Sequence, residues 1–202
     1  TVHRATACVP DAALAAWRTL DAGDRGGGLV FNENEVREIR PQRSQSRVLQ
    51  LLHAVSELNQ GLARSEPISG DVTLNHAVEK ALRLAKHDHL VILVSDRDGA
   101  NTETKRLATQ LAPHNDVLIV AVYDPLGASL QGSPGMMAAN RGETIEVPSG
   151  KPFSDAFQKE FVSRIDEWAE IFRALRVPVL PVSTARPVPE QIRTLFGRSL
   201  TR

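Results

Sequence analysis

This 202-residue chain has a single cysteine, no long apolar run and no excess of charge of either sign. The single cysteine, Cys8, cannot form an internal disulfide, which excludes a secreted disulfide scaffold. No apolar run approaches the roughly 20 residues that span a bilayer, and no secretory signal is visible. Lys and Arg together number 24, as do Asp and Glu, so no net charge draws the chain to nucleic acid or to an anionic membrane. These absences predict a cytoplasmic globular protein.

Helical and strand patterns alternate along the chain. Two runs, 90–94 and 117–122, are wholly apolar, which is typical of strands buried on both faces of a parallel sheet. A short buried strand at 27–32 and an alternating strand at 35–40 are expected to pair as an antiparallel hairpin, the second strand at an edge. Further patterns predict helices at 10–20, 44–59, 73–86, 102–111, 153–175 and 187–196, and an edge strand at 177–182 that contains Pro178 and Pro181.

This order of elements predicts an α/β fold. We expect a doubly wound, mainly parallel sheet with helices on both faces, in which 29–31, 90–94 and 117–122 run parallel and 35–40 is the antiparallel edge strand. Pro10 suits the first turn of the first helix. Between 127 and 152 the composition shifts to Gly, Ser, Pro and Ala, which predicts a long, variable loop with a small strand at 144–147.

Polar residues follow the apolar run 90–94 at once. Ser95, Asp96 and Asp98 lie where ligands and metals bind in open α/β sheets, at the carboxyl end of a strand. They could bind Mg²⁺, which takes oxygen ligands and keeps several waters. The simpler interpretation is that Asp96 caps the following loop and that Asp98 belongs to a plain turn. A competing functional interpretation is a metal-dependent enzyme that uses Asp96 and Asp98, although the chain has no visible nucleophile elbow or nucleotide fingerprint.

Other suggestive residues have simpler interpretations. The glycines 26–28 precede a strand, whereas a phosphate-binding loop follows a strand and opens a helix, so a tight entry into the strand is favoured. His87 and His89 lack metal-ligand spacing, and His87 suits a helix C-terminus. A basic strip, which we expect to be solvated or to dock a protein, consists of Arg37, Arg40, Arg43 and Arg47.

Seven short segments form a specific combination spread over nearly the whole chain. They are Ala15-Ala16-Trp17, Gly23-Asp24-Arg25, Gly28-Leu29-Val30-Phe31, Ile39-Arg40-Pro41, Val94-Ser95-Asp96, His114-Asn115-Asp116-Val117 and Val122-Tyr123-Asp124-Pro125-Leu126. With them the chain resembles the family called domain of unknown function 58. The resemblance implies a von Willebrand factor A-like fold and an association with MoxR-type AAA+ ATPases that assemble or mature other proteins. No catalytic activity is established for that family.

The same resemblance implies where a metal-ion-dependent adhesion site would lie. Such a site uses an Asp-x-Ser-x-Ser loop after the first strand, a Thr before a later helix and an Asp after the fourth strand. Asp96 matches the last of these, and Val72 falls at the Thr position with Thr73 one residue away. The Asp-x-Ser-x-Ser loop is absent, because the chain begins beyond it. We therefore expect Asp96, Ser95 and Thr73 to bind Mg²⁺ weakly or not at all, and no other cofactor.

The resemblance also implies that a central strand is missing between the strands at 27–32 and 90–94. Unpaired buried backbone groups cost ~1–3 kcal/mol each, so an upstream segment or another strand is expected in that slot. We expect residues 1–202 to form one von Willebrand factor A-like domain, incomplete at its N-terminus. Its expected function is non-enzymatic binding of a protein, such as a MoxR-type ATPase, with no binding of nucleic acid and no membrane span. The expected partner-binding residues are Asp96, Asp98, Arg40 and Arg43.

Overall fold

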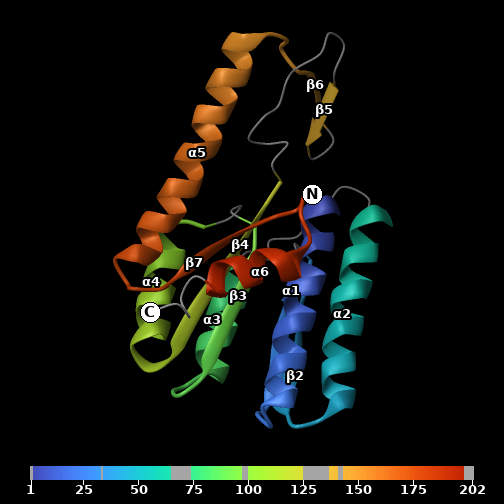
Figure 1. Ribbon diagram of the computed structural model, residues 1–202, viewed down its shortest axis with the longest axis vertical. Coiled ribbons are helices and arrows are strands. Elements are labelled where there is room, and N and C mark those ends of the chain that lie inside the picture. The colour runs from blue at the N-terminus through green and yellow to red at the C-terminus, as the bar shows by residue number, and fades with distance from the viewer. Residues whose placement is uncertain are drawn as a thin grey trace.

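The computed structural model of the chain describes residues 2–32, 34–64, 74–96, 100–124, 137–140 and 143–197. Figure 1 shows their arrangement. In chain order the elements are α1 (Val2–Asp21), β1 (Gly26–Phe31), β2 (Val36–Gln42), α2 (Gln45–Arg64), α3 (Leu74–Leu84), β3 (Leu90–Ser95), α4 (Thr102–Leu111), the 3-10 turn η1 (Ala112–His114), β4 (Asp116–Tyr123), β5 (Met137–Asn140), β6 (Glu143–Glu146), α5 (Lys151–Arg173), β7 (Val179–Ser183) and α6 (Val188–Gly197). None of the described helices has the length and apolar character needed to cross a membrane.

The centre of the molecule is a parallel sheet of three strands in the order β3-β4-β7. Val91 pairs with Val117 and Ile119 pairs with Val179. The predicted parallel arrangement of 90–94 and 117–122 is therefore confirmed. The strand predicted at 177–182 forms β7, and it lies at an edge of the sheet among the described strands.

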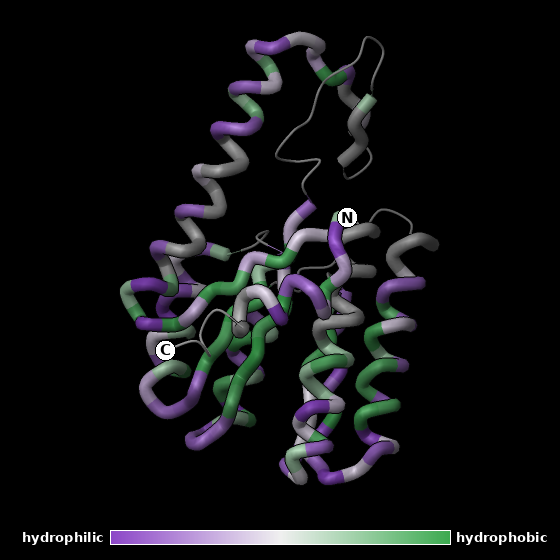
Figure 2. The backbone as a smooth tube through the Cα atoms, viewed as in Figure 1, coloured by the Kyte–Doolittle hydropathy of each residue, from purple (hydrophilic) through white to green (hydrophobic). Residues whose placement is uncertain are grey.

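Helices cover both faces of this sheet. One face packs against a core built from α3, α4 and the end of α5, comprising Leu74, Val78, Leu107, Ala108, Ile119, Phe172 and Val177. The other face packs against α6 through Val120, Val122, Val182 and Val188. Full burial of such a side chain stabilises the fold by about 1.5–3 kcal/mol. The wholly apolar runs of β3 and β4, continuous hydrophobic stretches in Figure 2, follow from these two covered faces.

β1 and β2 form a separate antiparallel hairpin, in which Phe31 pairs with Val36. At its turn, the side-chain oxygen of Asn32 accepts hydrogen bonds from the N–H groups of Asn34 and Glu35, at 2.9 and 3.0 Å. The antiparallel pairing was predicted correctly. The prediction that β1 belongs to the parallel sheet was wrong for the described residues, since β1 and β3 do not pair with each other. Both strands contact α1 instead.

Two helices are longer than the sequence pattern predicts. α1 begins at Val2, so Pro10 lies inside the helix and not in its first turn. A proline inside a helix removes one hydrogen bond, and the alanines around it favour continuation. α2 continues to Arg64, five residues beyond the helix predicted at 44–59. Gln, Leu, Ala and Arg in this stretch are strong helix formers.

The region predicted as a long loop, 127–152, contains a small antiparallel hairpin. Its strands are β5, which was not expected, and β6, which corresponds to the strand predicted at 144–147. Residues 127–136 and 141–142 of this region lie outside the described residues. In Figure 1, β5 and β6 lie near the amino end of α5, away from the three-stranded sheet.

Candidate functional site

The carboxyl end of β3 carries the first polar residues after the apolar run. Ser95 is the last residue of β3 and is buried, and Asp96 follows it, half-buried. In an open α/β sheet, the carboxyl ends of the strands and the amino ends of the helices meet at one rim, where ligands bind. The rim here therefore brings together the end of β3, the start of α3 and the start of α4.

A side-chain network joins the amino ends of α3 and α4. The N–H groups of Glu103 and Thr104 donate to the side-chain oxygen of Asn101, at 2.9 and 3.2 Å, and the N–H of Asn101 donates to Oγ1 of Thr104 at 3.0 Å. This reciprocal capping box fixes the start of α4. The Oγ1 of Thr104, whose residue is 1% exposed, donates to Oδ1 of Asn75 at 2.6 Å, and Nδ2 of Asn75 donates to Oδ1 of Asn101 at 3.1 Å. The two helix ends are thus held together beside Asp96.

The sequence analysis missed Asn75, Asn101 and Thr104. One signal was available for two of them, because an Asn directly before a helical pattern with Thr three residues later indicates a capping box. The contact between Asn75 and Asn101, 26 residues apart, has no signature in a single sequence.

Carboxylates lie along this rim, and one of them is paired with an arginine. Besides Asp96, it includes Glu103 in the first turn of α4, and the half-buried Asp124 follows β4. The hydrogen bonds from Arg106 hold the pKa of Glu103 below its ordinary value. Because both side chains are exposed, this ion pair contributes little to stability.

The rim beyond β7 is occupied by a structural clamp. Gln191 is buried, and its side-chain oxygen accepts from the N–H of Ser183 at 2.9 Å. Its Nε2 donates to the carbonyl oxygens of Ser183 and Arg186, both at 2.8 Å. A buried amide that is bonded to backbone on both sides holds a turn in place. The part of the rim available for docking is therefore the side at β3.

The described residues do not make up a tight Mg²⁺ site. Of the predicted ligands, Asp96 and Ser95 lie at the rim, whereas Thr73 and Asp98 lie outside the described residues. The oxygens of Asn75 and Asn101 already accept hydrogen bonds within the capping network. Within the described ranges, no group of three or more His, Cys, Asp or Glu side chains could hold a metal ion. Asp96 is thus the one predicted carboxylate ligand that the structure places, and Mg²⁺ usually takes one or two, together with waters and other oxygens.

The basic strip lies away from Asp96. Arg40 is exposed over 85% of its side chain, with its Nε 3.6 Å from Glu38, and Arg43 is exposed in the loop between β2 and α2. Arg37 is bound to Glu35 and Glu57, which raise the pKa of Arg37, while Arg37 lowers the pKa of Glu35. Figure 1 shows the loop between β2 and α2 at the same end of the molecule as the loop between α3 and β3. The loop between β2 and α2, which carries Arg43, therefore lies at the end of the molecule away from the carboxyl end of β3.

Comparison with known proteins places the chain in a family. The family model described as "Protein of unknown function DUF58" matches residues 2–167, more than three quarters of the chain. The chain belongs to the DUF58 family. No curated protein and no solved structure matches it. The family carries no assigned activity, so the function of this DUF58 chain has to be argued from its rim.

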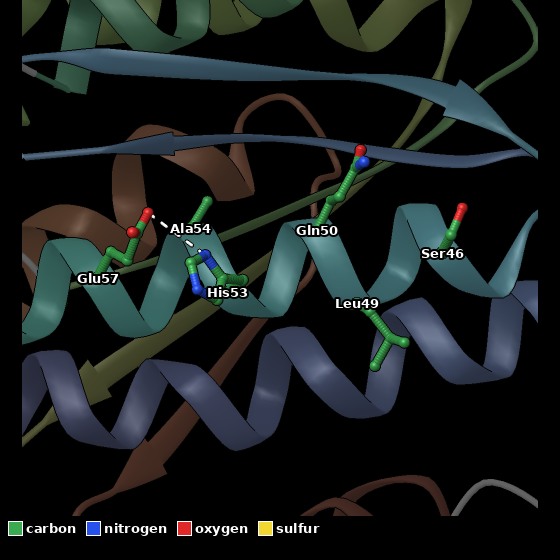
Figure 3. A pocket seen from close by; sticks show the side chains of 6 residues that line it. All are labelled: Ser46, Leu49, Gln50, His53, Ala54 and Glu57. Atoms are coloured by element: carbon green, nitrogen blue, oxygen red, sulfur yellow. Dashed lines mark ion pairs between the residues drawn. The ribbon is translucent and has the colours of Figure 1, made fainter.

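A surface hollow of about 440 Å³ lies on α2 of the DUF58 chain, away from the rim. It is lined by Ser46, Leu49, Gln50, His53, Ala54 and Glu57, and His53 contacts Glu57 at 3.4 Å (Figure 3). All six lining residues come from one helix, so the hollow has no opposing wall. Ligand pockets enclose most of the surface of their ligand. This hollow is a groove along a helix surface, and we assign no ligand to it.

Proposed function

We propose that this DUF58 chain is a non-enzymatic protein-interaction module with a von Willebrand factor A-like fold. It works with a MoxR-type AAA+ ATPase in the assembly or maturation of other proteins. The docking surface is the rim around Asp96 at the carboxyl end of β3. The observation that carries the proposal is the network of Asn75, Thr104 and Asn101, which fixes two helix ends beside a half-buried carboxylate.

The chemistry of the rim supports docking more than catalysis. Nucleophilic catalysis needs a nucleophile hydrogen-bonded to a base that a third group orients. The polar side chains joined at the starts of α3 and α4 are two amides and a hydroxyl, and they bond to each other and to backbone groups. A rigid rim that carries the carboxylates of Asp96 and Asp124 suits recognition of a basic surface on a partner.

A degenerate adhesion site fits this role. In this proposal Asp96 contacts the partner with its own carboxylate, and Mg²⁺ contributes weakly or not at all. Arg40 and Arg43, both exposed, lie in β2 and in the loop that follows it, and they offer a second place for a partner to bind.

The variant Asp96→Ala tests the proposal. Its affinity for a MoxR-type ATPase from the same organism should fall about tenfold or more, which corresponds to at least about 1.4 kcal/mol. The measurement is calorimetry or a pull-down with purified proteins. The matched control is Asp116→Ala, which removes an exposed carboxylate at the amino end of β4 and should leave binding unchanged.

Melting temperatures separate docking from a structural role. Asp96→Ala should melt within a few degrees of the parent chain, because a polar rim residue contributes little to the core. Unchanged binding would move the working surface to Arg40 and Arg43. A large drop in melting temperature would make Asp96 a structural cap, and a Mg²⁺-dependent activity lost in Asp96→Ala would favour the enzyme that uses Asp96 and Asp98.

A further inference from the structure

The turn between α3 and β3 carries two histidines, His87 and His89, on either side of Asp88. All three side chains are exposed, that of His87 over 75% and that of Asp88 over 90% of its surface. The turn leads into the amino end of β3, at the opposite end of that strand from Asp96. The docking surface proposed at the rim does not include it, and the short spacing of the two histidines is not that of a structural zinc site.

Hydrogen bonds to the backbone hold this turn in one shape. The N–H of Asp88 donates to the carbonyl oxygen of His114 at 2.8 Å, and the N–H of Asp116 donates to the carbonyl oxygen of His89 at 2.9 Å. The N–H of His89 donates to Oδ1 of Asn115 at 3.1 Å. Asp88 has a φ of 59°, in the left-handed region, which Asp adopts more readily than most residues. The two imidazole rings are therefore attached to a fixed turn.

The hydrogen bonds of the two rings determine which ring nitrogen carries the hydrogen. Nδ1 of His87 lies 2.7 Å from Oδ2 of Asp88, and Nδ1 of His89 lies 2.5 Å from the carbonyl oxygen of His87. An ionised carboxylate and a carbonyl oxygen can only accept a hydrogen bond. Nδ1 is therefore the donor in both rings, and Nε2 of each neutral ring keeps its lone pair.

Histidines that bind metals use this arrangement. A histidine that binds a metal through one ring nitrogen donates the hydrogen of its other nitrogen to a carboxylate, a backbone carbonyl or a water. His87 has the carboxylate as its acceptor, and His89 has the carbonyl. Imidazole nitrogen suits ions such as Zn²⁺ and Ni²⁺, whereas Mg²⁺ prefers oxygen ligands. Both rings therefore present Nε2 in the state that binds a transition metal.

The two rings supply half of the four ligands that Zn²⁺ takes. The Cα atoms of His87 and His89 are two peptide units apart, which is at most about 7.6 Å, so one ion lies within reach of both side chains. Within the described part of the chain, no group of three His, Cys, Asp or Glu side chains could hold a metal ion. A metal bound here therefore keeps open positions.

We propose that His87 and His89 bind one divalent transition-metal ion, such as Zn²⁺, through their two Nε2 atoms at the amino end of β3. Water completes the coordination in the isolated chain, and a ligand group from another molecule can replace that water. The carboxylate of Asp88 orients the ring of His87 and places a negative charge beside the ion. This site takes a different class of ion from the rim at Asp96 and does not depend on the proposed docking function.

Calorimetric titration with Zn²⁺ at about pH 8, where ordinary histidines are neutral, tests the two ligands. The whole chain should bind Zn²⁺ with a dissociation constant tighter than about 0.1 mM, and His87→Ala and His89→Ala should each weaken binding at least about tenfold. The matched control is His53→Ala, which removes an exposed histidine on α2 and should bind like the parent chain. Asp96→Ala should also bind like the parent chain, so a failure of the rim proposal leaves this one testable.

Nitrogen-15 NMR of the imidazole rings tests the two tautomers directly. In the metal-free chain, His87 and His89 should both carry the hydrogen on Nδ1, and Zn²⁺ should shift their Nε2 resonances while Mg²⁺ does not. Because the two side chains are exposed, both alanine variants should melt within a few degrees of the parent chain. A hydrogen on Nε2 in either neutral ring, a dissociation constant weaker than about 0.1 mM, or unchanged binding in either alanine variant would each overturn the proposal.

Discussion

Asn115 joins three segments that meet near the amino end of β3. Its Nδ2 donates to the carbonyl oxygens of Ala85 and Leu111, at 3.2 and 3.1 Å, and its Oδ1 accepts from the N–H of His89 at 3.1 Å. The two carbonyls lie at the ends of α3 and α4, where helices leave acceptors without intrahelical partners. One side chain therefore completes two helices and anchors the loop before β3.

We expect Asn115→Ala to lower the free energy of unfolding by about 1–3 kcal/mol, because it leaves partly buried backbone groups unpaired. Urea denaturation of the two proteins measures the difference. His114→Ala is the matched control, since this neighbouring side chain is exposed, and its effect should stay within about 0.5 kcal/mol. Equal losses for both variants would contradict the structural role of Asn115.

Single residues were predictable where a strand ends. Asp96 could be placed at the rim because an apolar run stops there and the carboxyl ends of parallel strands collect ligands. Asn115 and Asn75 could not be assigned their roles, because their partners, apart from Leu111, are 26 to 30 residues away. Hydrogen bonds of this range depend on how the helices pack, which a single sequence does not display.

At the scale of elements, β1 depends on its glycines for close packing. A Cβ at Gly27 would lie 2.7 Å from the carbonyl oxygen of Ile39 and from the nitrogen of Pro41, which are backbone atoms of β2. A Cβ at Gly28 would lie 2.6 Å from Cδ1 of Leu51, the flexible end of a side chain on α2. The glycine run, predicted as a tight entry into a strand, thus also permits close approach of β2 and α2 to β1.

This difference predicts an order of stability among three alanine variants. Gly27→Ala should destabilise by about 1–3 kcal/mol, because the backbone of β2 has to move. Gly28→Ala should cost less, about 0.5–1.5 kcal/mol, since Leu51 can change its rotamer. Gly61→Ala, inside α2 with open space at its Cβ, should stabilise by about 0.5–1 kcal/mol.

Chemical denaturation of the three glycine variants checks that order. A loss at Gly28 that exceeds the loss at Gly27 would show that α2, and not β2, is the tighter neighbour of β1.

Elements with strong and bounded patterns were predicted well. The helix predicted at 102–111 matches α4 residue for residue, because an apolar stripe marks its length. Pro10 misled the prediction for α1, since proline is most frequent in the first turn but is tolerated inside a helix at a cost. β5 was missed because its four residues give too short a pattern to recognise.

At the scale of the whole molecule, a Mg²⁺ site at the rim would need ligands from separate segments. Asp96 follows β3, and the position predicted for a Thr ligand precedes α3. We expect Mg²⁺ to bind this chain with a dissociation constant weaker than about 10 μM, about −7 kcal/mol. Calorimetric titration measures it, with Asp96→Asn as the control that removes the charge of the one carboxylate placed at the rim. A tighter constant that is lost in the control would show that Asp96 belongs to an assembled site.

The fold class was predictable, whereas the division into two sheets was not. Apolar runs reveal that β3 and β4 are covered on both faces, and their alternation with helices indicates a parallel sheet. Such patterns do not say which strands are neighbours. The sequence of β1 indicates a buried strand, and Phe31 does pack against the common core. Among the described strands, however, β1 pairs with β2 alone.

The two edges of the parallel sheet differ in a way that bears on aggregation. Pro181 lies in the middle of β7, opposite Ala121 of β4, and a proline in an edge strand turns its nitrogen, which carries no hydrogen, to the outside. Fibrils that grow by pairing the sheet edge of one molecule with the sheet edge of the next need two receptive edges in every molecule. Among the described strands, one edge of this sheet is blunted by proline, and the other is the side of β3 that pairs with no described strand. Within the part of the chain that the structure describes, the sheet therefore lacks the pair of receptive edges that open-ended polymerisation requires.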